Sequence, residues 1–395
     1  MFPSGFYRRQ LLLPGLILLA TGPVRGQMQR DREGFQWGSV VIHPEVSIRA
    51  AYDDRTLWSP GNALDDFYTE AAAGVRLENL PALFRITGNA RYGYRYYSQY
   101  TTLDDDFYSA GASVSTTDSP LLLEISTALD KSLDYDARYD PDTGEGPGSI
   151  LTDRRRERLV SRGRVGYAYG VAEALAIVPT YALEHYYETF EPSGSAEWQI
   201  HEASLQLRRQ QTEYTQLSVA GSYGVQVNDD ENGTIATLSA GISSRISEKT
   251  RWNLTLGYGV ADYEISGTDQ GFVGDLRINW QTTERMSLYA FGGSDFQPGY
   301  NGGAARKVYR AGYGANWQPL DRWVFGASML HDYEEDVGNS SSSSSRVTGQ
   351  VRNFFNAQTT HIFTPRVSMT LSGTYNDDQR DPSQTVISLR ATYSF

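Results

Sequence analysis

Arginine recurs at alternate positions in several segments of this sequence. In residues 83–97, Arg85, Arg91 and Arg95 share one parity, whereas most positions of the other parity are apolar or aromatic. Guanidinium groups hold carboxylates or phosphates through paired hydrogen bonds. Because the side chains of a β-strand alternate between two faces, one strand could present all three arginines on the same face.

The same alternation places further arginines on this face. A guanidinium facing hydrocarbon would cost about 2 to 4 kcal/mol near the centre of a bilayer, so this face is predicted to be the wet one. The arginines predicted to line the interior and set its selectivity are Arg49, Arg76, Arg85, Arg91, Arg95, Arg158, Arg162, Arg164, Arg208, Arg277, Arg310, Arg352 and Arg390.

Fewer acids are expected on that face, which predicts a basic interior although the formal net charge of the chain is −12. Most of the acid is assigned to loops, such as Asp53, Asp66 and 104–106. The alternative is that arginines and acids pair across strands and only stiffen the wall. Both interpretations stay open at this point. The acids predicted to face inward are Glu45, Glu70, Glu124, Glu184, Glu202 and Asp275.

The elements that must position these residues are predicted to be strands throughout. Two-residue alternation runs from Val40 to the final segment Gln384–Phe395, and longer polar loops are expected at 53–65, 134–153, 298–305 and 337–345. The pattern predicts an all-β fold, a transmembrane antiparallel up-and-down β-barrel of about 18 strands, with 16 as the fallback. The predicted short connections are 78–82, 117–120, 170–174, 211–215, 247–250, 282–285, 319–322 and 363–366.

The N-terminal segment has the pattern of a secretory signal peptide. Arg8 and Arg9 precede the apolar stretch 11–20, and small residues follow up to Gly26. The predicted organisation is therefore a signal peptide at 1–26, a short periplasmic lead-in at 27–38 and a transmembrane barrel at 39–395. The lead-in is too short for a plug domain.

Aromatic residues support a membrane setting. Four tryptophans lie beside predicted short connections, so all four are expected at one rim of the barrel. Indole prefers the boundary between membrane and water, because its body is apolar and its N–H is polar. The predicted aromatic girdle is Trp252, Trp280, Trp317 and Trp323.

Several other classes of function are disfavoured. The histidines are scattered without a neighbouring nucleophile, so no catalytic residues and no enzymatic activity are expected. No metal ligand set and no cofactor are predicted, and the chain contains no Cys, although acidic loops such as 104–106 could bind a divalent cation. The acidic balance argues against a nucleic-acid partner. The histidines are His43, His185, His201, His331 and His361.

The end of the chain resembles the C-terminal signature of bacterial outer-membrane barrels, in which an amphipathic strand closes on an aromatic residue, here Phe395. The segment AYDDRTLWSPGNALDDFYTEAAAGVRLEN resembles outer-membrane β-barrel porins of the type found beside exopolysaccharide gene clusters, although Arg55 follows the Asp pair where Asn is usual. The next predicted hairpin repeats this theme.

The resemblance implies a protein of the Gram-negative outer membrane, in contact with lipid and lipopolysaccharide. It implies that Phe395 is the signal read by the barrel-assembly machinery. It also implies passage of small solutes or polysaccharide, with a periplasmic export partner as one option. We therefore expect a channel that passes anionic solute or polysaccharide by diffusion or export through an arginine-rich interior. The alternative is a structural or adhesive barrel with a blocked interior.

Overall fold

The protein is described here by a computed structural model in which nearly every described residue lies in a β-strand. The predicted signal peptide at 1–26 and the predicted loops at 134–153, 298–305 and 337–345 lie outside the described residues. The structure describes residues 34–59, 62–79, 83–117, 119–133, 155–172, 174–190, 194–228, 232–264, 267–297, 306–336, 350–378 and 381–395.

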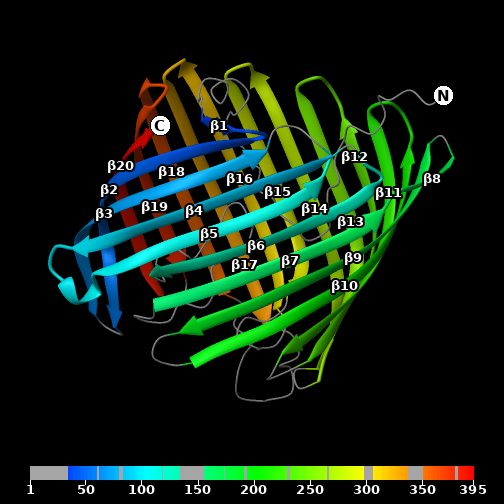
Figure 1. The fold of residues 1–395 in the computed structure, drawn as a ribbon. Coiled ribbons are helices and arrows are strands. Elements are labelled where there is room, and N and C mark those ends of the chain that lie inside the picture. The colour runs from blue at the N-terminus through cyan, green and yellow to red at the C-terminus, as the bar shows by residue number, and fades with distance from the viewer. Residues whose placement is uncertain are drawn as a thin grey trace.

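The strands form one antiparallel sheet that closes on itself (Figure 1). In chain order they are β1 (Phe35–Trp37), β2 (Val40–Ser59), β3 (Asn62–Asn79), β4 (Phe84–Tyr97), β5 (Asp105–Thr116), β6 (Leu121–Leu133), β7 (Arg155–Tyr167), β8 (Tyr169–Ala172), β9 (Leu175–Phe190), β10 (Gly194–Gln210), β11 (Thr215–Asn228), β12 (Gly233–Arg245), β13 (Thr250–Tyr263), β14 (Gly267–Thr283), β15 (Met286–Gln297), β16 (Arg306–Leu320), β17 (Trp323–Asp336), β18 (Gln350–Thr364), β19 (Val367–Asp378) and β20 (Asp381–Ser394). The one helical element described is a single 3-10 turn, η2 (Thr101–Leu103), between β4 and β5.

Closure comes from the pairing of the first wall strand with the last. β2 pairs antiparallel with β20, from Glu45 opposite Ser394 to Asp53 opposite Val386. The short β1 only folds back onto the start of β2, through a turn in which Gly38 has a positive φ of 61°. β8 follows β7 along the same neighbour, β9. The wall is therefore a closed barrel of 18 strands, which confirms the predicted fold class.

The eight predicted short connections are confirmed by the strand bounds. Each falls between strands at one end of the barrel, the end at which β2 starts and β20 finishes. We call this the short-turn end, and the other rim the opposite end. In outer-membrane barrels the short turns face the periplasm.

The predicted loop at 53–65 is wrong. β2 and β3 continue through this segment as a long hairpin, pairing Leu57 with Leu64 and Ser59 with Asn62 after a register shift that follows Asp53. Polar residues there suggested a loop, but a strand that extends beyond the hydrocarbon has no need of apolar side chains. The prediction therefore failed where the wall leaves the membrane.

Alternation along each strand separates an outer from an inner face. On β20, Ile387 and Leu389 are 51% and 44% exposed, whereas Ser388 between them is 5% exposed. Directly paired residues of neighbouring strands share a face, so the register carries this assignment around the whole barrel. The outer face bears most of the exposed large apolar side chains.

Small hydroxyl residues join neighbouring strands across the inner face. The hydroxyls of Ser372 and Ser388 lie 2.8 Å apart, and those of Ser222 and Thr237 lie 2.7 Å apart. Such cross-strand pairs stabilise a sheet without requiring a dry core. Among the described residues, no helix is both long enough and apolar enough to span a membrane.

Candidate functional site: the inner face of the barrel

The inner face carries the arginines predicted from alternation. One row of directly paired residues shows this: Arg390 on β20 lies opposite Arg49 on β2, which lies opposite Glu70 on β3, which lies opposite Arg95 on β4. These residues share the face of Ser388, opposite the exposed apolar residues of β20. Following the register through the other strands places all thirteen predicted arginines on this same face.

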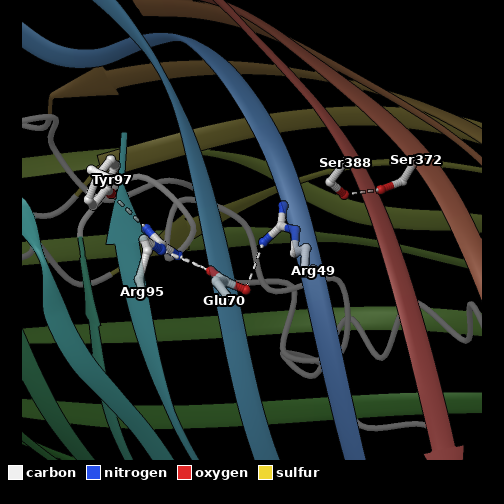
Figure 2. Close-up of polar contacts among 6 residues, drawn as sticks. All are labelled: Arg49, Glu70, Arg95, Tyr97, Ser372 and Ser388. Atoms are coloured by element: carbon white, nitrogen blue, oxygen red, sulfur yellow. Dashed lines mark hydrogen bonds and ion pairs between the residues drawn. The ribbon is translucent and has the colours of Figure 1, made fainter. Parts of the chain in front are cut away.

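A buried carboxylate bridges two of these arginines (Figure 2). The Arg95 Nη2 and Nε donate to Glu70 Oε1 at 2.6 and 2.9 Å, and Arg49 Nη1 lies 3.6 Å from Glu70 Oε2. Arg95 also donates to the Tyr97 hydroxyl at 3.2 Å. Glu70 is 3% exposed. The one carboxylate holds both guanidiniums in place and offsets one of their two positive charges, so this part of the wall is a brace.

A second network ties three strands together at the opposite end. Arg306 on β16 and Arg352 on β18 each bind one oxygen of Glu334 on β17, at 3.1 and 3.2 Å. Arg310 Nε lies 3.4 Å from Asp332 Oδ1. The side chains of Arg352 and Glu334 are only 3% and 6% exposed. Charges this buried require partners, because an unpaired ion would lose its hydration without compensation.

A third inner-face cluster combines charge with aromatic stacking. Tyr186 donates to Glu184 at 2.5 Å and accepts from Arg162 at 3.0 Å. The Tyr186 ring stacks on Trp198 with a centroid distance of 5.0 Å and an angle of 7° between the planes. Trp198 is 4% exposed. Sequence reasoning assigned aromatics to the rims and missed this stack, although the inward parity of Trp198 on β10 was a usable signal.

Other predicted arginines have no such brace. Within the described part of the chain, no ion pair forms at Arg76, Arg85, Arg91, Arg164 or Arg208. Arg91 lies over the ring of Phe107 at 5.2 Å, and Arg208 donates to Gln206 at 2.7 Å. The buried Nε atoms of Arg76 and Arg164 have no hydrogen-bond partner among the described atoms.

The interior holds more acid than the sequence predicted. The register places the six expected acids inward, and it adds others, most of which lie near the opposite end. Asp53 and Asp66 were assigned to a loop and are instead buried inner-face residues of β2 and β3, 4% and 0% exposed. The described inner face is therefore less basic than predicted. The further inner-face acids are Asp53, Asp66, Glu78, Asp105, Asp130, Glu188, Asp269, Asp295, Asp332 and Glu334.

Asp66 has a structural role that its sequence position did not suggest. Its carboxylate accepts hydrogen bonds from the backbone N–H groups of Phe67, Gln99 and Tyr100 and from the Ser98 hydroxyl. These donors tie the connection between β4 and η2 to β3. A carboxylate satisfied by several N–H donors stays buried without a cation.

The four predicted girdle tryptophans lie on the outer face close to the short turns. Trp280 and Trp317 are 47% and 48% exposed. Trp323 stacks near Phe325 at 6.0 Å and lies 4.4 Å from the ring of His361. Trp252 is half-buried in the same band, on β13. Aromatic side chains at this level suit a membrane boundary.

Phe395 lies at the same rim. Its backbone N–H donates to the carbonyl of Pro44 at 3.1 Å, across the closing seam of the barrel. Its ring meets that of Tyr393 edge-on at 4.8 Å and is 45% exposed on the outer face. A closed antiparallel wall with an apolar outer band satisfies its backbone internally, as spanning a bilayer requires. The protein is an outer-membrane β-barrel.

The described residues of this outer-membrane barrel bring together no group of three or more His, Cys, Asp or Glu side chains placed to hold a metal ion. In the predicted acidic cluster at 104–106, Asp105 faces inward and Asp106 faces outward, and the ammonium of Lys131 lies 3.4 Å from the first carboxylate and 2.5 Å from the second.

The barrel was compared with known proteins. No protein-family model and no curated protein matches the sequence. Among solved structures it is similar to OpdQ of Pseudomonas aeruginosa, with a TM-score of 0.48, 10% identity and coverage of 90% of this chain and 97% of that one. It is similar to the FrpB iron transporter from Neisseria meningitidis, with a TM-score of 0.45 and 12% identity over 89% of this chain, and it spans only 63% of FrpB. The copper transporter OprC gives a TM-score of 0.46 and 11% identity, covering 92% and 82%. Because these scores are low, placement in the outer membrane rests on the barrel's own geometry.

Proposed function

We propose that this barrel is a channel for anionic solutes, and that its cargo includes anionic polysaccharide delivered by a periplasmic partner. The observation that carries the proposal is the group of inner-face arginines without an ion pair in the described part of the chain: Arg76, Arg85, Arg91, Arg164 and Arg208. A guanidinium already bound to a carboxylate attracts little else, whereas one without such a partner concentrates anions beside it.

Barrels of this size support the proposal. Small barrels fill their interiors with side chains, whereas those of about 16 to 18 strands commonly keep an aqueous channel. Passage through such an interior needs no covalent chemistry. Under this proposal the protein is therefore no enzyme, enters the periplasm behind a cleaved leader and is folded by the barrel-assembly machinery. Under this proposal the barrel itself supplies no energy for transport, so the periplasmic partner sets the direction in which the cargo moves.

A structural or adhesive barrel with a blocked interior is the second candidate. The observation in its favour is the depth of burial on the inner face near the opposite end, where Asp332 and Arg352 are 2% and 3% exposed. Side chains that water hardly reaches suggest that part of the wall is covered. In such a barrel, cross-strand pairs such as Arg310–Asp332 would stabilise the wall and would bind no solute.

Planar-bilayer recording of the purified full-length protein separates the two candidates. A channel gives stepwise current, and a salt gradient gives a reversal potential of the sign expected for anion preference. The Arg76→Gln, Arg85→Gln, Arg164→Gln variant should lose most of that preference. A matched control removes the same charge outside the interior, at Arg209→Gln, Lys249→Gln and Arg366→Gln, and should keep it. Absence of current supports the blocked barrel, and a cation-selective reversal potential contradicts the anion channel.

A further inference from the structure

β1 is held to the barrel on one side only. Its three residues, Phe35–Trp37, pair with residues 40–42 of β2, and no other strand of the described residues pairs with them. β1 lies at the same rim as Phe395, whose backbone N–H donates to the carbonyl of Pro44 (Figure 1). A two-stranded hairpin is at best marginally stable in water, so a pairing this short needs further stabilisation.

The backbone of this hairpin is shaped for close approach to the wall. A Cβ at Gly34, the residue before β1, would lie 2.6 Å from the carbonyl oxygen of Ile42 and 2.7 Å from Nδ1 of His43, so glycine is required there. Gly38 turns the chain with a φ of 61°. The side-chain amide of Gln36 donates to the Gly38 carbonyl at 3.1 Å. The hairpin is therefore a specified part of the fold.

The side chains of β1 continue the two faces of the wall. Phe35 and Trp37 pair with β2 residues that share the outer-face parity of Ile48, because directly paired residues lie on one face. Gln36 between them has the inner-face parity. Phe35 and Trp37 are 60% and 79% exposed, so contacts within the described structure cover little of either ring. The barrel itself therefore removes little of their apolar surface from water.

The outer surface around β1 is the lipid-facing band of the barrel. Along the same edge of β2, Phe35 follows Phe395, whose ring is 45% exposed on the outer face. On the other side of β2, Leu77 lies opposite Ile42 and is 38% exposed. β1 contributes no charged side chain. A surface that is apolar, uncharged and continuous with the membrane-facing wall fits lipid better than it fits water.

We propose that the outer face of β1 is a lipid-binding surface, on which Phe35 and Trp37 bind the boundary region of the leaflet at the short-turn end. Aromatic rings favour this region, and burying them there supplies the stabilisation that the short pairing lacks. The membrane then fixes β1 beside the outer wall, so that residues 34–38 stay clear of the mouth of the barrel. This inference goes beyond the proposed function and applies to a conducting or a blocked barrel.

Spin labels on β1 test the proposal with the purified full-length protein in vesicles of phosphatidylethanolamine and phosphatidylglycerol. The chain contains no Cys, so Phe35→Cys, Gln36→Cys and Trp37→Cys each provide one label site. Ile48→Cys on the lipid-facing wall and Glu248→Cys in an exposed short turn give the two reference values. Collisions are measured with oxygen, which concentrates in lipid, and with a nickel chelate, which stays in water. We expect the labels at 35 and 37 to favour oxygen and the label at 36 to favour the chelate.

Hydrogen exchange in the same vesicles tests the native side chains. The Phe35→Ser, Trp37→Ser variant should speed backbone exchange across residues 34–38 about 10-fold, a factor equal to about 1.4 kcal/mol. The matched control is Val46→Ser, Ile48→Ser, which removes two lipid-facing side chains from the paired wall of β2. It should leave exchange across 34–38 close to that of the unmodified protein.

Labels at 35 and 37 that favour the nickel chelate would overturn lipid as the occupant of this surface, and would point to a protein that the vesicles do not contain. Unchanged exchange across 34–38 in the Phe35→Ser, Trp37→Ser variant would also contradict the proposal. Neither result depends on current through the barrel, so a failure here is distinguishable from a failure of the proposed function.

Discussion

Loss of the inner-face acid Glu70 is predicted to destabilise the barrel strongly. Its carboxylate contacts Arg95 at 2.6 Å and Arg49 at 3.6 Å, and its side chain is 4% exposed. Glu70→Gln keeps the size of the side chain but leaves two buried guanidiniums without their shared counter-charge. Breaking a buried ion pair by removing one partner typically costs about 3 to 5 kcal/mol, so we expect a loss of that order in the free energy of unfolding.

Glu78→Gln is the matched control, because it makes the same change on the same face of β3. Glu78 pairs with His43 at 3.1 Å, but its side chain is 40% exposed, so the expected loss is below about 1 kcal/mol. The measurement is urea unfolding in lipid vesicles, followed by Trp fluorescence and by the mobility shift of folded barrels on gels. Restoring balance with Arg95→Gln in the Glu70→Gln background should recover part of the loss. Equal stability of the two single variants would refute the reasoning.

Three further predictions concern assembly, membrane position and the rim. Phe395→Ser should lower the amount of folded barrel in the outer membrane several-fold while leaving refolding from urea in detergent largely unchanged, which fractionation and gel mobility would show. In variants that retain only Trp280 or Trp317, lipids brominated near the headgroup should quench the Trp fluorescence more strongly than lipids brominated at the chain end. The opposite order would contradict a position of these tryptophans at the membrane boundary. Asp66→Asn should destabilise the barrel by about 1 to 3 kcal/mol, because one acceptor serves several donors, and should expose 98–104 to protease before the strands.

Much of the fold could be predicted because the relevant physics is local. Each short turn joins two strands that meet at the membrane boundary, so polar residues such as those at 247–250 interrupt the alternation there. The prediction failed at 53–65, where the strands continue beyond the membrane and no longer need an apolar face. It also failed for Asp53 and Asp66, since the same misjudged loop removed them from the interior.

The candidate site was predictable only in part. Parity within a strand placed Arg76 and Arg352 on one face, because a strand offers only two. The alternation within one strand does not predict that Arg352 lies beside Glu334. Nor does it predict that no carboxylate of the described residues pairs with Arg76. Those contacts depend on the register between strands and on their stagger around the barrel, which connect residues far apart in the chain.

The sequence by itself determined the class of fold, the side of each strand that faces lipid, and the rim at which Trp280, Trp317 and Phe395 lie. These properties follow from the two-residue period of a strand and the cost of polar groups in hydrocarbon, both of which act on short segments. Only the tertiary structure decided which arginines lie beside a carboxylate. The stagger of 18 closed strands sets the height of every residue relative to residues on other strands. Ion pairing and the field in the interior depend on those relative heights, and no single segment contains that information.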